Sequence, residues 1–304
     1  MITLCLSSTT PNTIMNLQQS WQRFVLAGVF ALGLYSWPAT AQTSKPTPAV
    51  LTHTTTRREV RKLGFGSTVT LLGGPAGNVT VEGWNKNEIE IVADIEVKAF
   101  NEEDLHRLAA LDGFVLDEGF TNLSIVTTGS HDKDFIKRYG KNFPKKLIGT
   151  PWRIDYHLKV PTLTDVDINN GNGSVTVRGV EGALSIKTLN GDADLTLTGG
   201  AVTATVGSGT VNINLASRSW RGRGAAIQLA TGRLNVTLPT SFNGDIDASV
   251  LRTGTLENTY PGLAPRERTK PTPTSLEGRS GTGGALLSFT VGDGILHLQP
   301  VPKE

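Results

Sequence analysis

Three pairs of aspartates are the residues of this 304-residue chain whose spacing could support chemistry. The members of each pair lie two residues apart, at Asp165 and Asp167, Asp192 and Asp194, and Asp245 and Asp247. Residues two apart in a strand face the same way. Such a pair could bind Ca²⁺ or supply the acid and base of a glycosidase or lyase. Two of the pairs follow Asn-Gly, and aspartates in such turns usually bond to nearby backbone. We therefore expect turn residues and no metal site.

The remaining side chains with catalytic potential form no recognisable set. The five histidines show no metal-ligand spacing, and neither a Gly-x-Ser-x-Gly elbow nor a phosphate-binding glycine loop occurs. The sequence thus predicts no catalytic residue, no cofactor and no enzymatic activity. Two alternatives remain open, a carbohydrate-active lyase or hydrolase on a β-solenoid and a purely structural envelope protein.

Positive charge gathers in three breaks of the strand pattern. Segments 131–148, 217–226 and 264–279 together carry a net charge of +9 on a chain whose formal net charge is +2. Basic segments with aromatic side chains suit an anionic glycan or a membrane surface with anionic lipid head groups, provided they share one side of the fold. Long solvated loops rich in lysine are the other reading. The predicted binding residues are Lys133, Lys137, Arg138, Tyr139, Lys141, Trp220, Arg221 and Arg223. No nucleic-acid partner is expected.

A nine-residue repeat must position these groups. Its glycines are Gly173, Gly182, Gly191, Gly200 and Gly209, and an apolar-type side chain stands two and four residues after each. Nine residues hold one short strand and one turn. The repeat therefore predicts an all-β stack of short strands with inward-facing Val175, Ile186, Leu195 and Ile213. A parallel solenoid and an antiparallel meander both accommodate this unit.

The region before the repeat combines strands with a single short helix. Residues 88–97 alternate between apolar and acidic side chains, as a half-buried strand does. Asn101 is a suitable N-cap for a helix that continues to Leu111. The expected organisation is a flexible linker at 42–63, a strand-helix-strand portion at 64–130, a basic insertion loop at 131–150 and a β-solenoid at 151–302.

The first 41 residues read as a signal peptide. Arg23 precedes an apolar run, Phe24–Tyr35, and the small-residue site Ala39-Thr40-Ala41 follows. Cleavage before Gln42 would leave an exported mature chain without cysteine, methionine or an apolar segment of membrane length. Periplasm, cell surface and extracellular space all fit. Whether Met1 or Met15 is the start, and the oligomeric state, stay open.

Several turn-and-strand phrases resemble those of a known family. They are Gly77–Trp84, Glu88–Val97, the acidic-leucine helix at 101–111, the strand Trp152–Pro161 and the Asn190-Gly191-Asp192 turn. In these phrases the chain is similar to the putative adhesin family of bacterial exported domains of unknown function, over about residues 64–300. The resemblance implies a β-helix-like, single-stranded solenoid without established enzymatic activity. With the charge pattern, it leads us to expect a non-enzymatic, adhesin-like binding module of the cell surface or envelope.

Overall fold

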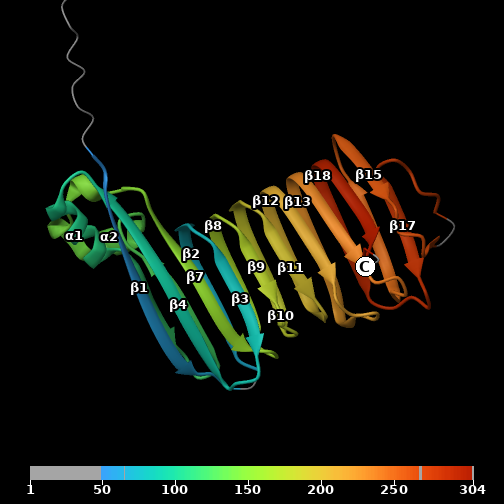
Figure 1. Cartoon of the computed structure of the whole chain (residues 1–304), viewed down its shortest axis with the longest axis horizontal. Coiled ribbons are helices and arrows are strands. Elements are labelled where there is room, and N and C mark those ends of the chain that lie inside the picture. Colours follow the sequence, from blue (N-terminus) through green and yellow to red (C-terminus); the bar gives the residue numbers. More distant parts are fainter. Residues whose placement is uncertain (1–48, 65, 267–268, 303–304) are drawn as a thin grey trace, which may run out of the picture. The chain divides into compact units, whose positions relative to one another are not determined.

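The computed structural model describes residues 49–64, 66–266 and 269–302, and the predicted signal peptide lies outside these ranges. The described residues form an all-β fold with one 18-stranded sheet that does not close, accompanied by two α-helices (Figure 1). None of the helices in these ranges is long and apolar enough to cross a membrane.

The N-terminal half of the sheet mixes antiparallel and parallel strand pairs. Its elements are β1 (Leu51–Lys62), β2 (Thr68–Ala76), β3 (Val79–Trp84), β4 (Glu88–Ala99), α1 (Glu102–Leu111), β5 (Gly113–Glu118), β6 (Asn122–Thr128), α2 (Lys133–Tyr139) and β7 (Trp152–Pro161). β4 pairs antiparallel with β1 and β7, whereas β2 and β3 pair parallel with two strands of the repeat region, β8 (Asp165–Asn172) and β9 (Val175–Arg178). The predicted strand at 88–97 and the predicted helix are both present. Asn101 caps α1 by accepting a hydrogen bond from the Asp104 backbone N–H at 2.8 Å.

Two predictions for this half are wrong. Residues 51–62, expected within a flexible linker, are strand β1, which pairs with β4 in register from Leu51–Ala99 to Lys62–Glu88. The sequence also predicts one helix, but residues 133–139 of the expected loop form α2.

The repeat region forms two parallel ladders of strands. Its strands are β8 (Asp165–Asn172), β9 (Val175–Arg178), β10 (Ala183–Asn190), β11 (Ala193–Leu197), β12 (Gly199–Leu215), β13 (Arg221–Leu238), β14 (Gly244–Val250), β15 (Gly254–Asn258), β16 (Leu263–Pro265), β17 (Ser275–Ser280) and β18 (Leu286–Pro300). Leu184 pairs with Val166 and Val202, and Ala193 pairs with Val175 and Val211. Each partner is 18 residues away, which is twice the repeat. Consecutive repeats therefore enter alternate ladders, and their pairing is parallel. At the far end β17 pairs antiparallel with β14 and β16.

Glycines at the turns let successive rungs stack with backbone against backbone. Gly191 has φ +145°, and a Cβ built on it would lie 2.1 Å from the carbonyl oxygen of Gly173. Only glycine fits such a position, because any side chain would overlap the rung below. The repeated glycines are thus a requirement of stacking.

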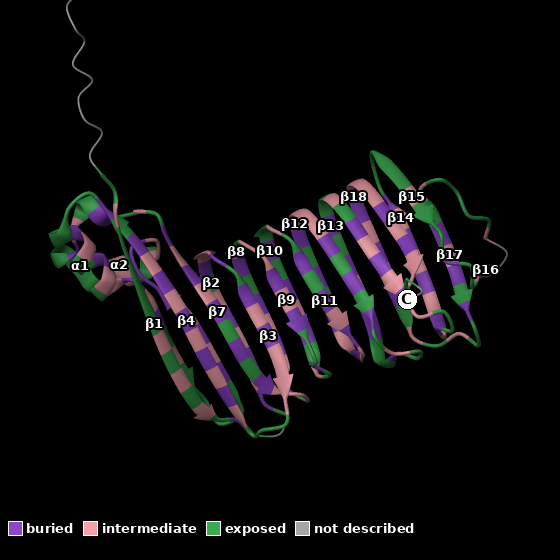
Figure 2. Ribbon diagram, in the orientation of Figure 1, coloured by how far each residue is buried: buried purple, intermediate pink, exposed green. Residues whose placement is uncertain are grey.

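The apolar residues of the repeat form the core. Val175, Ile186, Leu195 and Ile213 are at most 1% exposed and belong to one hydrophobic cluster, which confirms their predicted inward orientation. Buried and exposed residues alternate along the strands (Figure 2).

The assignment of the inward face can be tested at neighbouring positions of β10. We expect Ile186→Val to lower the free energy of unfolding by about 1 kcal/mol, because it removes one fully buried methyl group. Lys187→Ala, at the adjacent exposed position, should change it by less than about 0.5 kcal/mol. Urea unfolding measures both, and equal effects would mean that the two faces of β10 are assigned wrongly.

Candidate binding surface

The first basic segment is a structured element that covers one end of the sheet. Asp132 is the N-cap of α2, and its carboxylate accepts hydrogen bonds from the backbone N–H groups of Asp134 and Phe135 at 2.9 and 3.1 Å. Two 3₁₀ turns follow, Gly140–Asn142 and Lys145–Leu147. In Figure 1, α1 and α2 lie beside each other at this end. The expected loop is therefore an ordered helical segment. Residues 133–147, called the platform from here on, hold its lysines in place.

The aromatic side chains of this segment mainly pack. The ring centroids of Phe135 and Tyr139 lie 6.0 Å apart, and those of Tyr139 and Phe143 lie 5.6 Å apart. Phe143 and Leu147 are buried, and Phe135 packs against the core cluster. Tyr139 is 48% exposed. Of the aromatic residues in this segment, it alone keeps the role of an exposed contact that the sequence predicts.

Five of the six cations of the segment form no ion pair with a described residue; the sixth, Lys146, pairs with Asp104. Among the described residues, no carboxylate lies in ion-pair distance of Lys133, Lys137, Arg138, Lys141 or Lys145. These five side chains are exposed, and the Arg138 guanidinium makes only a long 3.4 Å hydrogen bond to the Asp134 carbonyl. Arginines on the strands differ: Arg58 pairs with Glu90 at 2.6 Å, and Arg153 pairs with Asp155 at 2.7 Å. The segment is thus a local source of uncompensated positive charge.

A mainly apolar pocket of about 320 Å³ opens beside this segment. It is lined by residues from the start of β1, the end of β4, α1 and the last 3₁₀ turn, namely Val50, Lys98, Ala99, Phe100, Asp104, Leu108, Lys146, Leu147, Thr150 and Pro151. Phe100 is 66% exposed, and Ile148, next to the lining residue Leu147, is 51% exposed. Ligand pockets have volumes of about 300–1,000 Å³ and predominantly apolar walls. This pocket meets both criteria at the lower end of the range.

Charged groups are found in the pocket lining as well. The Lys146 ammonium lies 2.6 Å from the Asp104 carboxylate. That hydrogen bond, assisted by the Asn101 amide, holds the pKa of Asp104 below its usual value. Lys98 pairs with Glu96 at 2.9 Å. This pocket could not be predicted from the sequence, because its walls come from four separate segments that only the fold brings together.

The second basic segment is mostly strand. Arg221 and Arg223 are exposed residues of β13 and form no ion pair among the described residues. Trp220 is only 9% exposed, and its indole N–H donates to the Gly200 carbonyl at 3.1 Å. The prediction that Trp220 offers an exposed stacking surface is therefore wrong, because the ring is packed against the preceding rung.

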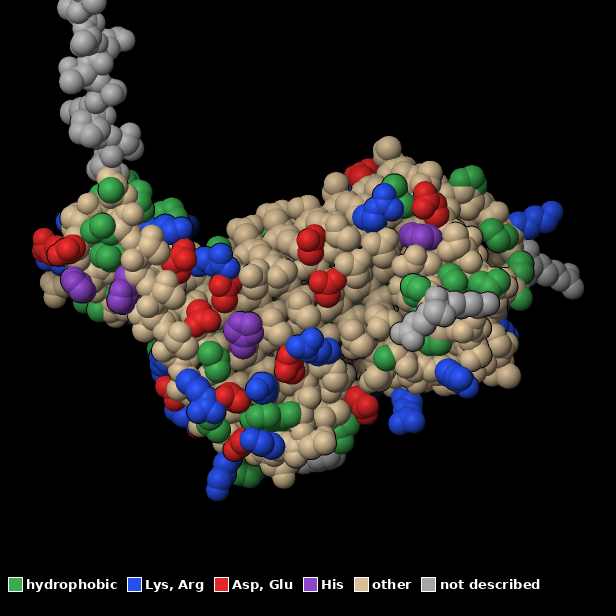
Figure 3. Space-filling model, in the orientation of Figure 1, with side chains coloured by type: hydrophobic (Ala, Val, Ile, Leu, Met, Phe, Trp, Pro, Cys, Tyr) green, Lys and Arg blue, Asp and Glu red, His purple; other side chains and the backbone are tan. Residues whose placement is uncertain are grey.

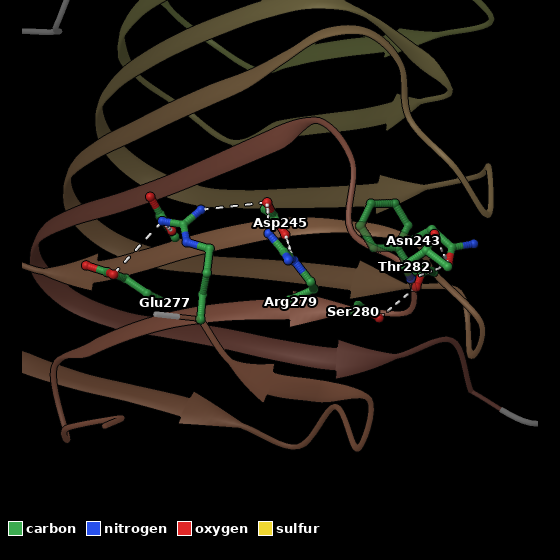
Figure 4. Close-up of polar contacts among 9 residues, drawn as sticks. Asn243, Asp245, Glu277, Arg279, Ser280 and Thr282 are labelled. Carbon is green, nitrogen blue, oxygen red and sulfur yellow. Dashed lines mark hydrogen bonds and ion pairs between the residues drawn. The ribbon is translucent and has the colours of Figure 1, made fainter. Parts of the chain in front are cut away.

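Two arginines of the third basic segment are neutralised by one of the aspartate pairs. Arg279 pairs with Asp245 at 2.8 Å and Arg266 with Asp247 at 2.7 Å, with Glu277 4.0 Å from Arg266 (Figure 4). The Arg279 hydrogen bond lowers the pKa of the Asp245 carboxyl. These carboxylates serve as partners for arginine across β14 and β17.

The other aspartates hold adjacent rungs together. Asp165 accepts from the backbone N–H of Ala183 at 2.7 Å, and Asp192 accepts from that of Thr210 at 2.8 Å. Each partner lies 18 residues further along the chain. The described residues contain no group of three or more His, Cys, Asp or Glu that could hold a metal ion.

The three basic segments do not add up to one positive field. His131 bonds to the Gly73 carbonyl in β2 at 3.1 Å, which places the first segment at that strand, whereas the third segment contains β17. Seven neighbour steps separate them, through β8, β10, β12, β13, β18 and β14. At about 4.8 Å a step this is about 34 Å, several Debye lengths at physiological salt. On the face in Figure 3 acidic and basic side chains are interspersed. The first segment must act alone.

One buried carboxylate links α1 to this platform. Asp112, the C-cap of α1, is 4% exposed and accepts hydrogen bonds from the Ser130 backbone N–H at 2.6 Å and from Ser130 Oγ at 3.3 Å. Burial raises its pKa to about 6 against the lowering effect of these bonds. The only feature of the sequence that could have drawn attention to Asp112 is its position directly after the predicted helix.

Comparison with known proteins yields distant structural similarity alone. No family model and no curated protein matches the chain. A putative cell adhesion protein from Clostridium sporogenes has 10% identity and a TM-score of 0.41, with 81% of this chain and 100% of that one covered. A putative adhesin from Bacteroides fragilis has 10% identity and a TM-score of 0.33, with 84% of this chain and 99% of that one covered. A putative lipid binding protein from Parabacteroides distasonis has 11% identity and a TM-score of 0.27, with 81% of this chain and 97% of that one covered. A function must therefore be argued from the geometry of this chain.

Proposed function

We propose that this chain is a non-catalytic binding module of the cell envelope whose ligand is an anionic lipid. The observation that carries the proposal is the apolar pocket beside a platform of exposed cations without ion-pair partners. An acyl chain would occupy the apolar walls, and Lys133, Lys137, Arg138 and Lys141 would attract the head groups of the surrounding lipids.

Exposed apolar side chains next to these cations favour a lipid surface over a soluble polyanion. Phe100, Ile148 and Tyr139 are each about half exposed or more. A soluble glycan would use the charge and leave these side chains in water, whereas insertion into the interfacial region of a bilayer removes them from it. Export of the chain, as the N-terminal sequence predicts, would place the module where envelope lipids are present.

The scaffold in this proposal is a β-solenoid of two ladders with 18 residues per turn. The parallel register of 18 residues and the buried alternate positions of both ladders support it. Such a stack would hold the platform at one end and leave the surface of the repeat region available to bind other ligands.

Vesicle co-sedimentation tests the lipid proposal. The triple variant Lys137→Ser, Arg138→Ser, Lys141→Ser should bind vesicles that contain phosphatidylglycerol roughly a hundredfold less tightly at low salt, since each cation near the surface contributes about 1 kcal/mol. Vesicles of phosphatidylcholine alone should bind both proteins weakly. Phe100→Ser should weaken binding at high salt as well, because it removes apolar contact.

A matched control separates the platform from net charge. Lys62, Lys187 and Arg233 are also exposed and form no ion pair among the described residues, and they lie on β1, β10 and β13. Their replacement by serine removes the same charge and should change vesicle binding much less. Equal losses in the two triple variants would overturn the proposal, as would undiminished binding by the first.

A further inference from the structure

A second pocket, small and polar, lies where three turns of the repeat region stack. Its volume is about 190 Å³, and its lining residues are Glu181, Thr198, Gly199, Gly200, Ser217 and Arg221. Glu181 precedes β10, Thr198 precedes β12, and Ser217 and Arg221 flank the turn into β13. The pocket therefore belongs to the corner where the chain passes from one ladder to the other.

An irregularity in the repeat creates this pocket. The pairing of β12 with β13 shifts register between Gly199 and Ala201, and the turn that follows β12 is longer than the preceding ones. Trp220 fixes the new path by donating to the Gly200 carbonyl. A Cβ on Gly199 would lie 2.4 Å from the Arg221 carbonyl oxygen. Backbone thus approaches closely on this side, and bulges of this kind commonly redirect side chains at binding sites.

Three polar side chains of the pocket lack partners within the described chain, whereas Ser217 Oγ donates a hydrogen bond to the Ser219 carbonyl at 2.8 Å. Thr198 Oγ1 is buried and makes no hydrogen bond there. Arg221 forms no ion pair with a described carboxylate, and neither does Glu181 with a described cation. A buried hydroxyl without a partner is costly, because it has given up its bonds to water. A ligand that supplies the missing partners would relieve that cost.

We infer that this pocket binds a sugar ring that carries a carboxylate, a hexuronate unit of an acidic polysaccharide. The Arg221 guanidinium would take the carboxylate in a bidentate contact, for which its planar fork is suited. Glu181 accepts hydrogen bonds from ring hydroxyls, and Thr198 Oγ1 completes the set. A phosphate ion has no ring hydroxyls for Glu181 and is repelled by it, and a neutral sugar leaves Arg221 without a counter-charge.

Neighbouring arginines extend the site along a polymer. Arg218 and Arg223 are exposed on either side of Arg221 and form no ion pair among the described residues. Four neighbour steps, or about 19 Å, separate β13 from β2, where the lipid platform is anchored. The uronate site is thus a second site, independent of the proposed lipid surface.

Calorimetric titration of the full chain with trigalacturonate tests this inference, with maltotriose as the neutral comparison. Trigalacturonate should bind and maltotriose should not bind measurably at the same concentration. Arg221→Gln should weaken trigalacturonate binding at least tenfold, and Thr198→Val should weaken it several-fold. Arg233→Gln, which alters an exposed arginine of the same strand away from the pocket, should leave the affinity unchanged.

Three results would overturn the inference. They are equal binding of maltotriose, equal loss of affinity in Arg221→Gln and Arg233→Gln, and displacement of trigalacturonate by equimolar inorganic phosphate. The platform variant Lys137→Ser, Arg138→Ser, Lys141→Ser should keep full affinity for trigalacturonate. A failure of vesicle binding and a failure of uronate binding are therefore distinguishable. In circular dichroism melting curves Arg221→Gln should match the parent chain, and Thr198→Val should melt at the same or a higher temperature, because it removes a buried hydroxyl without a partner. Any loss of affinity is then assigned to the pocket.

Discussion

Replacement of Gly191 by alanine is expected to lower the free energy of unfolding by about 4 kcal/mol or more. Gly191 has φ +145°, which side chains of L-residues rarely allow, and its added Cβ would lie 2.1 Å from the Gly173 carbonyl oxygen. That oxygen belongs to the backbone of the preceding rung and cannot turn aside. The glycine at 209 is stacked on Gly191 in the same manner, at 2.3 Å, so a shift of one rung disturbs the next. Urea unfolding followed by circular dichroism measures the loss.

A glycine elsewhere in the chain separates the cost of the backbone conformation from the cost of steric overlap with the neighbouring rung. Gly140, after α2, also has a positive φ, +76°, but a Cβ there meets no atom within 4 Å. We expect Gly140→Ala to cost about 1–3 kcal/mol, from backbone conformation alone. If Gly191→Ala cost no more than that, close stacking of the rungs would be refuted, and the nine-residue period would need another explanation.

The repeat shows how far sequence reasoning reaches in this fold. The glycine period and the apolar register predicted turns, short strands and the buried faces of Val175 and Ile186, because both depend on residues within one unit. Parallel and antiparallel pairing stayed undecided, because the partner of each strand lies two units away. The ladder that a nine-residue unit joins depends on how the units stack, and the sequence of a single unit does not indicate it.

Strand β1 and helix α2 were missed for opposite physical reasons. No residue of β1 is fully buried, and its sequence of threonines and arginines lacks the apolar–polar alternation that marks a half-buried strand. α2 has a signal, the capping Asp132, but its seven residues are too few to display a helical apolar stripe. Tertiary contacts through Phe135 and Ile136 stabilise it.

The sequence showed where basic residues are concentrated, but it could not show which of them are neutralised by carboxylates far away in the chain. The lysines around α2 were correctly expected to be exposed, because the acidic residues close to them in sequence are few. The neutralisation of Arg279 depends on the pairing of β14 with β17, which brings it beside Asp245, 34 positions away. Arg266 meets Asp247, 19 positions away. The burial of Trp220 likewise follows from contact with Gly200, and no local feature of its segment indicates it.

Asp112 should make the stability of the fold depend on pH in the direction opposite to ordinary surface carboxylates. Its pKa is raised to about 6 from 3.8, chiefly by burial, so the folded chain holds this proton more tightly than the unfolded chain does. The stabilising effect of the proton is complete below pH 3.8 and is lost as the pH rises through about 6. Above that range the fold carries a buried negative charge, and in the described part of the chain its hydrogen bonds come from Ser130 alone.

Asp112→Asn is therefore expected to stabilise the protein at pH 8 by about 3 kcal/mol and to have little effect near pH 4. The amide oxygen can keep the bond from the Ser130 backbone N–H, and the amide nitrogen can donate to Ser130 Oγ, so the link between α1 and the platform survives without the charge. Denaturant unfolding at a series of pH values measures the difference. Asp117→Asn, at an exposed position of β5 without an ion pair among the described residues, is the matched control and should give a flat difference. Parallel pH curves for Asp112→Asn and the parent chain would show that this carboxyl titrates alike in the folded and unfolded states, and burial of its charge would then play no part in stability.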